Sequence, residues 1–272
     1  MKQLFTILLL GTLHFMFSCN SDDSSKLSKE GKSTNANPQS NKKYHVNPEE
    51  LLKDFTTWYT YTYYNIRLSQ DFAGLNVDSS IIKKGDFLNL LSTGNFVPVK
   101  IMVKDNLPFY KLYRFGNSNM DIQRTIKQMS LTEIEHSEME GKELPAYNFT
   151  DLNGKTYNKS STKGKIIILK CWFIHCVACV KEFPELNKLV DEYKNRNDIQ
   201  FVSLAMDSKE KLTLFLKTKE FKYAVIPEQK KFMIEQMNIT GYPTHILIGK
   251  DGKIVKVVNS IDELIPFIKK RA

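Results

Sequence analysis

Three cysteines and one histidine lie within nine consecutive positions, in the stretch CWFIHCVAC at residues 171–179. Cysteine thiolates bind metal ions, form structural disulfides, or cycle between dithiol and disulfide during electron transfer. The chain contains four cysteines, and the fourth, Cys19, lies far upstream. Structural disulfides would spread cysteines along the chain, and structural zinc sites usually use a second CxxC or HxxxH motif, which this sequence lacks. The pattern therefore favours a redox function.

The elements expected around this stretch decide which cysteines react together. Residues 164–174, GKIIILKCWFI, are a largely apolar, β-branched run bounded by a glycine, which predicts a buried strand. At about 3.3 Å per strand residue, Cys171 lies about 16 Å from Cys176, too far for both sulfurs to bind one metal ion. We therefore predict that Cys171 is a small core residue and that Cys176 and Cys179 are the reactive pair. We expect no metal and no cofactor.

The segment after the pair changes its periodicity. Over residues 180–196 the apolar side chains recur at steps of three and four, which predicts an amphipathic helix. The motif CVAC thus spans a junction between strand and helix, with Cys176 at the helix N-terminus. Free N–H groups and the helix dipole favour a thiolate there and lower the cysteine pKa. This placement predicts that Cys176 and Cys179 form a redox couple.

Further elements follow, and without the short extended piece at 221–227 and the helical segment at 228–239 the predicted order from the first strand is β-α-β-α-β-β-α. After the helix at 180–196, the patterns indicate elements at 198–207, 208–220, 221–227, 228–239, 241–249, 253–258 and 261–271. The turn Lys250–Gly252 joins the last two strands as a hairpin.

From Glu138 onward the chain resembles the thioredoxin superfamily, and within it the TlpA/ResA-type envelope thiol-disulfide oxidoreductases. Four motifs carry the resemblance: the lead-in GKELPAYNFTDLNGKTYN at 141–158, Trp172 four residues before Cys176, the C-x-x-E-x-P run with Glu182 and Pro184, and Pro243 before the hairpin. The resemblance implies an α/β, thioredoxin-like fold over residues 138–272, with a central mixed sheet flanked by helices.

The resemblance also implies roles for individual residues. Cys176 and Cys179 would form a redox-active disulfide. Pro243 would be a cis-proline, and its loop, Tyr242–Pro243, would face the disulfide and pair with the substrate backbone. The implied partners are disulfide-containing envelope proteins and a membrane electron donor.

Two candidate site residues depart from the family pattern. His175 replaces the usual tryptophan before the first cysteine, and Lys170 occupies the place of the buried acid of thioredoxins. A desolvated Lys170 could accept the proton of Cys179 or favour the Cys176 thiolate, but its ammonium could also reach solvent. Glu182, one helical turn after Cys179, is either a second proton relay or a solvated residue. His175 is a third candidate for tuning the thiol pKa.

The N-terminus resembles a bacterial lipoprotein signal. An apolar run ends at Ser18-Cys19, which predicts a signal peptide over residues 1–18 and a lipidated Cys19. Alternatives are an ordinary signal peptide and a retained anchor helix. Residues 19–43 are polar and predict a disordered tether, and the acidic pair Asp22-Asp23 resembles export signals of Bacteroidetes surface lipoproteins. We expect a lipid-anchored protein of the cell envelope, at the periplasmic face or on the outer-membrane surface.

Residues 44–137 match no family that we can name and predict a small α+β module. A helix begins at Asn47-Pro48, a hairpin covers 95–115, and an amphipathic helix covers 119–139. The aromatic stripe around Trp58 is either core or a surface that docks a partner.

Three functions remain open. The leading one is a membrane-tethered thiol-disulfide oxidoreductase that reduces envelope proteins. A peroxiredoxin-like peroxidase would have a threonine three residues before the reactive cysteine, where this chain has Phe173. A carrier for copper or haem maturation would use Cys176, Cys179 and His175. Nucleic acid is not expected as a partner, because the formal charge of +9 is scattered along the chain.

Overall fold

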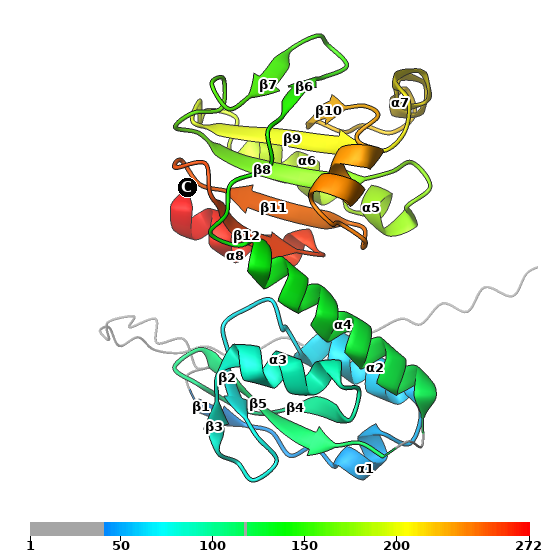
Figure 1. Ribbon diagram of the computed structural model, residues 1–272, viewed down its shortest axis with the longest axis vertical. Coiled ribbons are helices and arrows are strands. Elements are labelled where there is room, and N and C mark those ends of the chain that lie inside the picture. Colours follow the sequence, from blue (N-terminus) through cyan, green and yellow to red (C-terminus); the bar gives the residue numbers. More distant parts are fainter. Residues whose placement is uncertain (1–40, 117–118) are drawn as a thin grey trace, which may run out of the picture. The chain divides into compact units, whose positions relative to one another are not determined.

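The protein is represented by a computed structural model that describes residues 41–116 and 119–272 (Figure 1). The predicted signal peptide, Cys19 and most of the predicted tether lie outside these residues. The last three residues assigned to the tether, Asn41–Lys43, form strand β1, which pairs antiparallel with Phe96–Lys104 (β4). The tether prediction is wrong there, because the backbone groups of these residues are paired in a sheet. No helix in the described part of the chain has the length and apolarity needed to cross a membrane.

The first sheet has five strands in the order β1-β4-β5-β2-β3, where β2 is Ala73–Leu75, β3 is Ile81–Ile82 and β5 is Leu107–Arg114. Strands β4 and β5 form the predicted hairpin. Its turn residues Asp105 and Asn106 have φ angles of 51° and 63°. Short polar side chains of this kind tolerate the left-handed conformation.

Four helices accompany this sheet: α1 (Pro48–Leu51), α2 (Phe55–Asn65), α3 (Lys84–Ser92) and α4 (Met120–Met139). The predicted helix start at Asn47 is confirmed, because its side chain accepts a hydrogen bond from the Glu49 N–H at 3.0 Å. Trp58 is fully buried in the core, whereas Tyr63 and Tyr64 on the same helix are exposed. The aromatic stripe is therefore core at Trp58.

The second sheet has the order β10-β9-β8-β11-β12, and its central strand β8 (Ile166–Trp172) is buried along its whole length. Strands β9 (Ile199–Ala205) and β10 (Ala224–Ile226) run parallel to β8. Strands β11 (Thr244–Ile248) and β12 (Ile254–Val258) form the antiparallel hairpin on its other side. The predicted mixed sheet of a thioredoxin-like fold is confirmed.

Alternate residues of β8 face opposite sides of this sheet. Ile168 and Trp172 face a core that includes α6 (Phe183–Glu192) and α8 (Ile261–Arg271). Cys171 faces the other core, with residues of β6 (Asn148–Thr150), β7 (Thr156–Asn158) and the helical turn η1 (Phe232–Gln236). The prediction that Cys171 is a core residue is confirmed.

The prediction of a helix over 228–239 is wrong in extent. Helical structure covers only residues 230–236 there, and it ends in the π-helical turn η1. The helix predicted over 208–220 does form, as α7 (Lys209–Leu216). Glu228 has a φ of 62°, which no right-handed helix contains. The N–H groups of Glu228 and Gln229 instead donate to the carbonyls of Asp207 and Ala205, so this segment is tied to the end of β9.

Candidate active site

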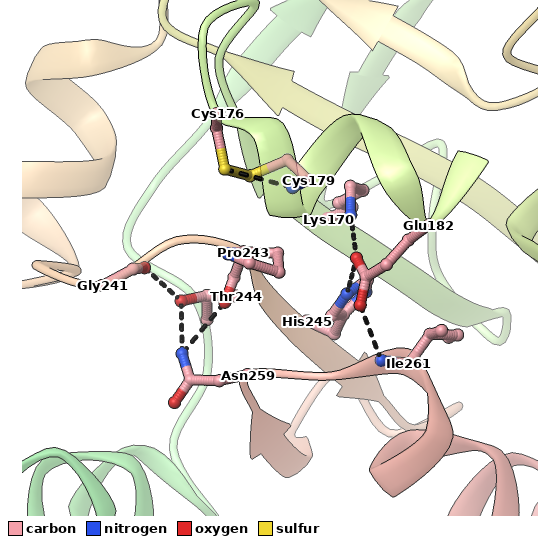
Figure 2. Close-up of polar contacts among 10 residues, drawn as sticks. All are labelled: Lys170, Cys176, Cys179, Glu182, Gly241, Pro243, Thr244, His245, Asn259 and Ile261. Atoms are coloured by element: carbon pink, nitrogen blue, oxygen red, sulfur yellow. Dashed lines mark hydrogen bonds and ion pairs between the residues drawn. A yellow bond between two sulfur atoms is a disulfide. The ribbon is translucent and has the colours of Figure 1, made fainter. Parts of the chain in front are cut away.

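Cys176 and Cys179 form a disulfide at the start of α5 (Val177–Lys181), directly after β8 (Figure 2). Cys176 is the residue before the first helical turn, and its Sγ accepts a hydrogen bond from the Cys179 N–H at 3.2 Å. Cys176 is 7% exposed and Cys179 is 0% exposed. Cys176 therefore retains a small exposed fraction, whereas Cys179 is covered by protein.

The active-site helix is interrupted one turn after the disulfide. Helix α5 ends at Lys181, and α6 begins at Phe183, with Pro184 in its first turn. Proline lacks an N–H group and fits the start of a helix better than its interior. Glu182 lies at the break between the two helices, where its side chain turns towards the sheet.

The loop before β11 faces the disulfide in Figure 2, and its Tyr242–Pro243 peptide bond is cis, as the resemblance implied. Thr244 Oγ1 donates to the Gly241 carbonyl at 2.7 Å. Asn259 Nδ2 donates to the Pro243 carbonyl at 2.9 Å. These bonds fix the loop from both sides.

Behind the disulfide, Lys170, Glu182 and His245 form a buried cluster (Figure 2). Glu182 Oε2 accepts from Lys170 Nζ at 2.5 Å and lies 2.9 Å from His245 Nε2. Its Oε1 accepts from the Ile261 N–H, at the start of α8, at 3.1 Å. Lys170 and His245 are 0% exposed.

Burial opposes charge throughout this cluster. Burial would raise the pKa of Glu182, but hydrogen bonds from His245 and Lys170, together with the positive charge of Lys170, outweigh it and lower that pKa. Burial lowers the pKa of Lys170 against the opposing charge of Glu182. Burial likewise lowers the pKa of His245. The contacts describe a Lys170–Glu182 ion pair with a neutral His245 that donates from Nε2.

The structure thus separates the three candidates for tuning the thiols. The Lys170 ammonium is enclosed and does not reach solvent, and Glu182 turns inward rather than outward. His175 is exposed beside Cys176 and is not part of the buried cluster.

Sequence reasoning missed His245. Lys170 and His245 are direct partners in the β8–β11 register, so their side chains lie on the same face of the sheet. The sequence signal was the polar His245 inside the apolar run THILI. Antiparallel pairing of this run with β8 places His245 opposite Lys170.

A hollow of about 720 Å³ is lined by residues that include Phe215, Asn187 and the two chain neighbours of Cys176, His175 and Val177. Val177 between the two cysteines is 81% exposed. Within residues 41–116 and 119–272, no three His, Cys, Asp or Glu side chains are arranged to hold a metal ion.

Comparison with known proteins points to one family. The AhpC/TSA family model matches residues 141–257. The thiol-disulfide oxidoreductase ResA of Bacillus thuringiensis is 31% identical over 150 residues, which are 54% of this chain and 86% of that protein. ResA of Bacillus subtilis is 30% identical over 120 residues, which are 44% of this chain and 66% of that protein.

Solved structures give similar matches. The thioredoxin domain of a thiol-disulfide oxidoreductase from Bacteroides vulgatus is 26% identical, with a TM-score of 0.43 over 48% of this chain and 96% of that one. A thiol-disulfide oxidoreductase from Bacteroides fragilis is 20% identical, with a TM-score of 0.44 over 47% of this chain and 98% of that one.

The segment matched by the family model contains both cysteines and the proline loop, and the likeness to ResA extends over most of a ResA protein's length. The chain therefore belongs to the ResA-like thiol-disulfide oxidoreductases of the thioredoxin superfamily.

Proposed function

We propose that this enzyme reduces disulfides of other cell-envelope proteins through Cys176 and Cys179. The observation that carries the proposal is the unequal exposure of the two cysteine residues. Cys176 is 7% exposed at the start of α5, whereas Cys179 is 0% exposed. An accessible sulfur can attack a substrate, and an enclosed neighbour can attack only the bond that the first sulfur makes.

The proposed cycle transfers two electrons. The Cys176 thiolate attacks a substrate disulfide, which forms a mixed disulfide and releases one substrate thiolate. Cys179 then loses its proton and attacks Cys176, which re-forms the Cys176–Cys179 bond and releases the second substrate thiolate. A dithiol donor at the membrane reduces the enzyme again and is itself oxidised to a disulfide.

Other residues support this cycle. The Tyr242–Pro243 loop would pair with the substrate backbone beside Cys176. The enclosed Lys170 ammonium would favour the thiolate, since a cation in a low-dielectric site stabilises a nearby anion. Glu182 would hold that ammonium in place, and His175 would act from the exposed side of the disulfide.

Mutants of the three cysteines test the proposal in insulin-disulfide reduction with a dithiol donor. Cys176→Ser should abolish turnover, and Cys179→Ser should accumulate a mixed disulfide with the substrate. Cys171→Ser is the control and should retain most of the activity, because Cys171 faces the opposite core. Full turnover by Cys176→Ser would disprove the assignment.

The AhpC/TSA match favours one alternative, a peroxidase. Phe173, three residues before Cys176, packs edge-on against Tyr242 at 5.6 Å between ring centroids and offers no hydroxyl to a peroxide. The same protein should therefore consume peroxide far more slowly than it reduces insulin. Faster peroxide consumption would reverse the assignment, and tight Cu(I) binding by the reduced protein would favour a metal carrier.

We also propose that a lipid on Cys19 anchors the enzyme at the periplasmic face or on the outer-membrane surface. The support is the sequence pattern around Ser18-Cys19. Labelling cells with a palmitate analogue should mark the wild type and leave Cys19→Ala unlabelled and in the soluble fraction. An unlabelled wild type would rule out the anchor.

A further inference from the structure

His245 has one nitrogen that the cluster does not use. Its Nε2 lies 2.9 Å from Glu182, whereas its Nδ1 is buried and has no hydrogen-bond partner in the described part of the chain. A buried nitrogen without a partner is uncommon in a folded protein and calls for an explanation. With Nε2 donating to the carboxylate, Nδ1 carries a lone pair that can accept a proton.

The three contacts on Glu182 make the carboxylate itself a poor proton acceptor. A proton on Oε2 would compete with the bonds from Lys170 and His245 and would leave the Lys170 charge unpaired in the interior. A proton on Nδ1 of His245 would disturb none of these bonds. It would also strengthen the Nε2–Glu182 bond by adding charge to the donor.

We propose that His245 is a redox-linked protonation site: when a dithiol donor reduces the Cys176–Cys179 disulfide, Nδ1 of His245 takes up a proton, and it releases that proton when the disulfide re-forms. His245 acts here through the buried cluster, as a positioning residue rather than a catalytic one. The proposal rests on the proposed dithiol-disulfide cycle.

The step balances in electrons and protons. Reduction breaks one S–S bond, Cys179 takes one proton as a thiol, and Cys176 remains a thiolate. The donor dithiol loses two electrons and two protons, and its second proton goes to His245. When the enzyme then reduces a substrate disulfide, both protons leave with the two substrate thiols.

The driving force is charge compensation. Cys179 lies in the same core as α6 and α8, on the face of β8 where Lys170 also lies, and Figure 2 shows the disulfide above the buried cluster. In the oxidised protein, the Lys170 and Glu182 charges cancel, and burial keeps His245 neutral. A thiolate adds one negative charge, and an imidazolium offsets it in a medium that screens charges poorly.

The groups that face His245 are few. Lys170 comes from β8, Glu182 from the helix break, and β12 places Val258 opposite His245. The titratable groups beyond Glu182 are Glu185, Tyr223 and Asp262. Of Lys170, Glu182 and His245, His245 is the residue whose ordinary pKa lies near neutral pH.

The test counts protons taken up per disulfide reduced. The full chain in mild detergent is equilibrated with a small dithiol and its disulfide at several pH values above the Cys176 thiol pKa, and the pH dependence of the midpoint potential gives the count. The wild type should take up two protons per two electrons. His245→Gln should take up one, because glutamine can still donate to Glu182 but does not titrate.

His136→Gln is the matched control. His136 is also buried, at 7% exposed against 0% for His245, and its Nδ1 likewise has no hydrogen-bond partner in the described part of the chain, but it lies on α4. This variant should still take up two protons. Equal counts for wild type and His245→Gln would overturn the proposal.

A spectroscopic measurement covers the case in which His245→Gln does not fold. The imidazole ¹⁵N shifts of the wild type should show Nδ1 of His245 protonated in the reduced protein alone, and unchanged shifts would also overturn the proposal. Both measurements use a small dithiol, so a failure to reduce envelope proteins would leave them unaffected.

Discussion

A buried lysine is the most unusual residue of this site. Lys170 lies in the middle of the central strand and is fully enclosed, with Glu182 as its counter-ion. Removing a charge from water costs several kcal/mol, and a close partner recovers that cost only when the geometry is good. A residue held at such cost beside a redox-active disulfide is more readily explained by its effect on the thiols than by stability.

Substitution of Lys170 tests this effect. Lys170→Met keeps much of the side-chain volume and removes the charge, so the Cys176 thiol pKa should rise, and a rise of one unit corresponds to about 1.4 kcal/mol. The rate of alkylation against pH, measured in a Cys179→Ser background, gives this pKa directly. Lys170→Arg retains the charge and should shift the midpoint little.

The same change should destabilise the fold. Glu182 would lose its cation while remaining largely buried, and because it keeps its bonds to His245 and Ile261 the loss should stay below the roughly 3–5 kcal/mol of a fully buried broken pair. An unchanged thiol pKa together with reduced stability would make Lys170 a structural residue without a role in the chemistry.

The elements around the site differ in how well sequence patterns predict them. The apolar run of β8 and the three-and-four periodicity of α6 predicted both elements, because each buries one continuous surface. The start of η1 was not predictable, because the φ of Glu228 reflects its bonding to the end of β9. The pairing of Lys170 with His245 was not predictable either, because it depends on the register between two strands that are distant in sequence.

Aromatic packing stabilises the start of α6, directly after the break between α5 and α6, and Phe183 makes the main contacts. Its ring stacks on Phe221 at 4.0 Å between centroids and meets Trp172 edge-on at 5.0 Å. Phe183→Ala should therefore lower the free energy of unfolding by about 3–5 kcal/mol. Urea unfolding measures this loss. Val177→Ala on α5 is the control and should change stability by less than about 0.5 kcal/mol, because Val177 is largely exposed.

At the scale of the whole molecule, ionisable side chains gather where α4 meets β12. Lys256 on β12 is enclosed and pairs with Glu140 at 2.7 Å. Glu133 and His136 on α4 are also buried, and Lys84 lies 3.9 Å from Glu133. Burial raises the pKa of Glu133 to about 7. Protonation of Glu133 and protonation of His136 therefore change the stability of this region in opposite directions.

His136 makes the fold sensitive to acid. Burial, assisted by the charge of Lys256, lowers the pKa of His136 from 6.5 to about 4. Between these two values the unfolded chain binds a proton at His136 that the folded chain does not bind, so the free energy of unfolding falls as the pH falls. The complete shift corresponds to about 3 kcal/mol.

Glu133 has the opposite effect on the free energy of unfolding. Its carboxyl binds a proton more tightly in the folded chain than in the unfolded chain, so the free energy of unfolding rises as the pH falls from about 7 to 4.5. The two effects are separated by comparing urea unfolding of the wild type and His136→Gln from pH 7.5 to pH 4, since Glu133 is present in both. The difference in free energy of unfolding should be constant above pH 6.5 and should then change steadily in favour of His136→Gln. A difference that does not vary with pH would mean that His136 titrates normally in the folded protein.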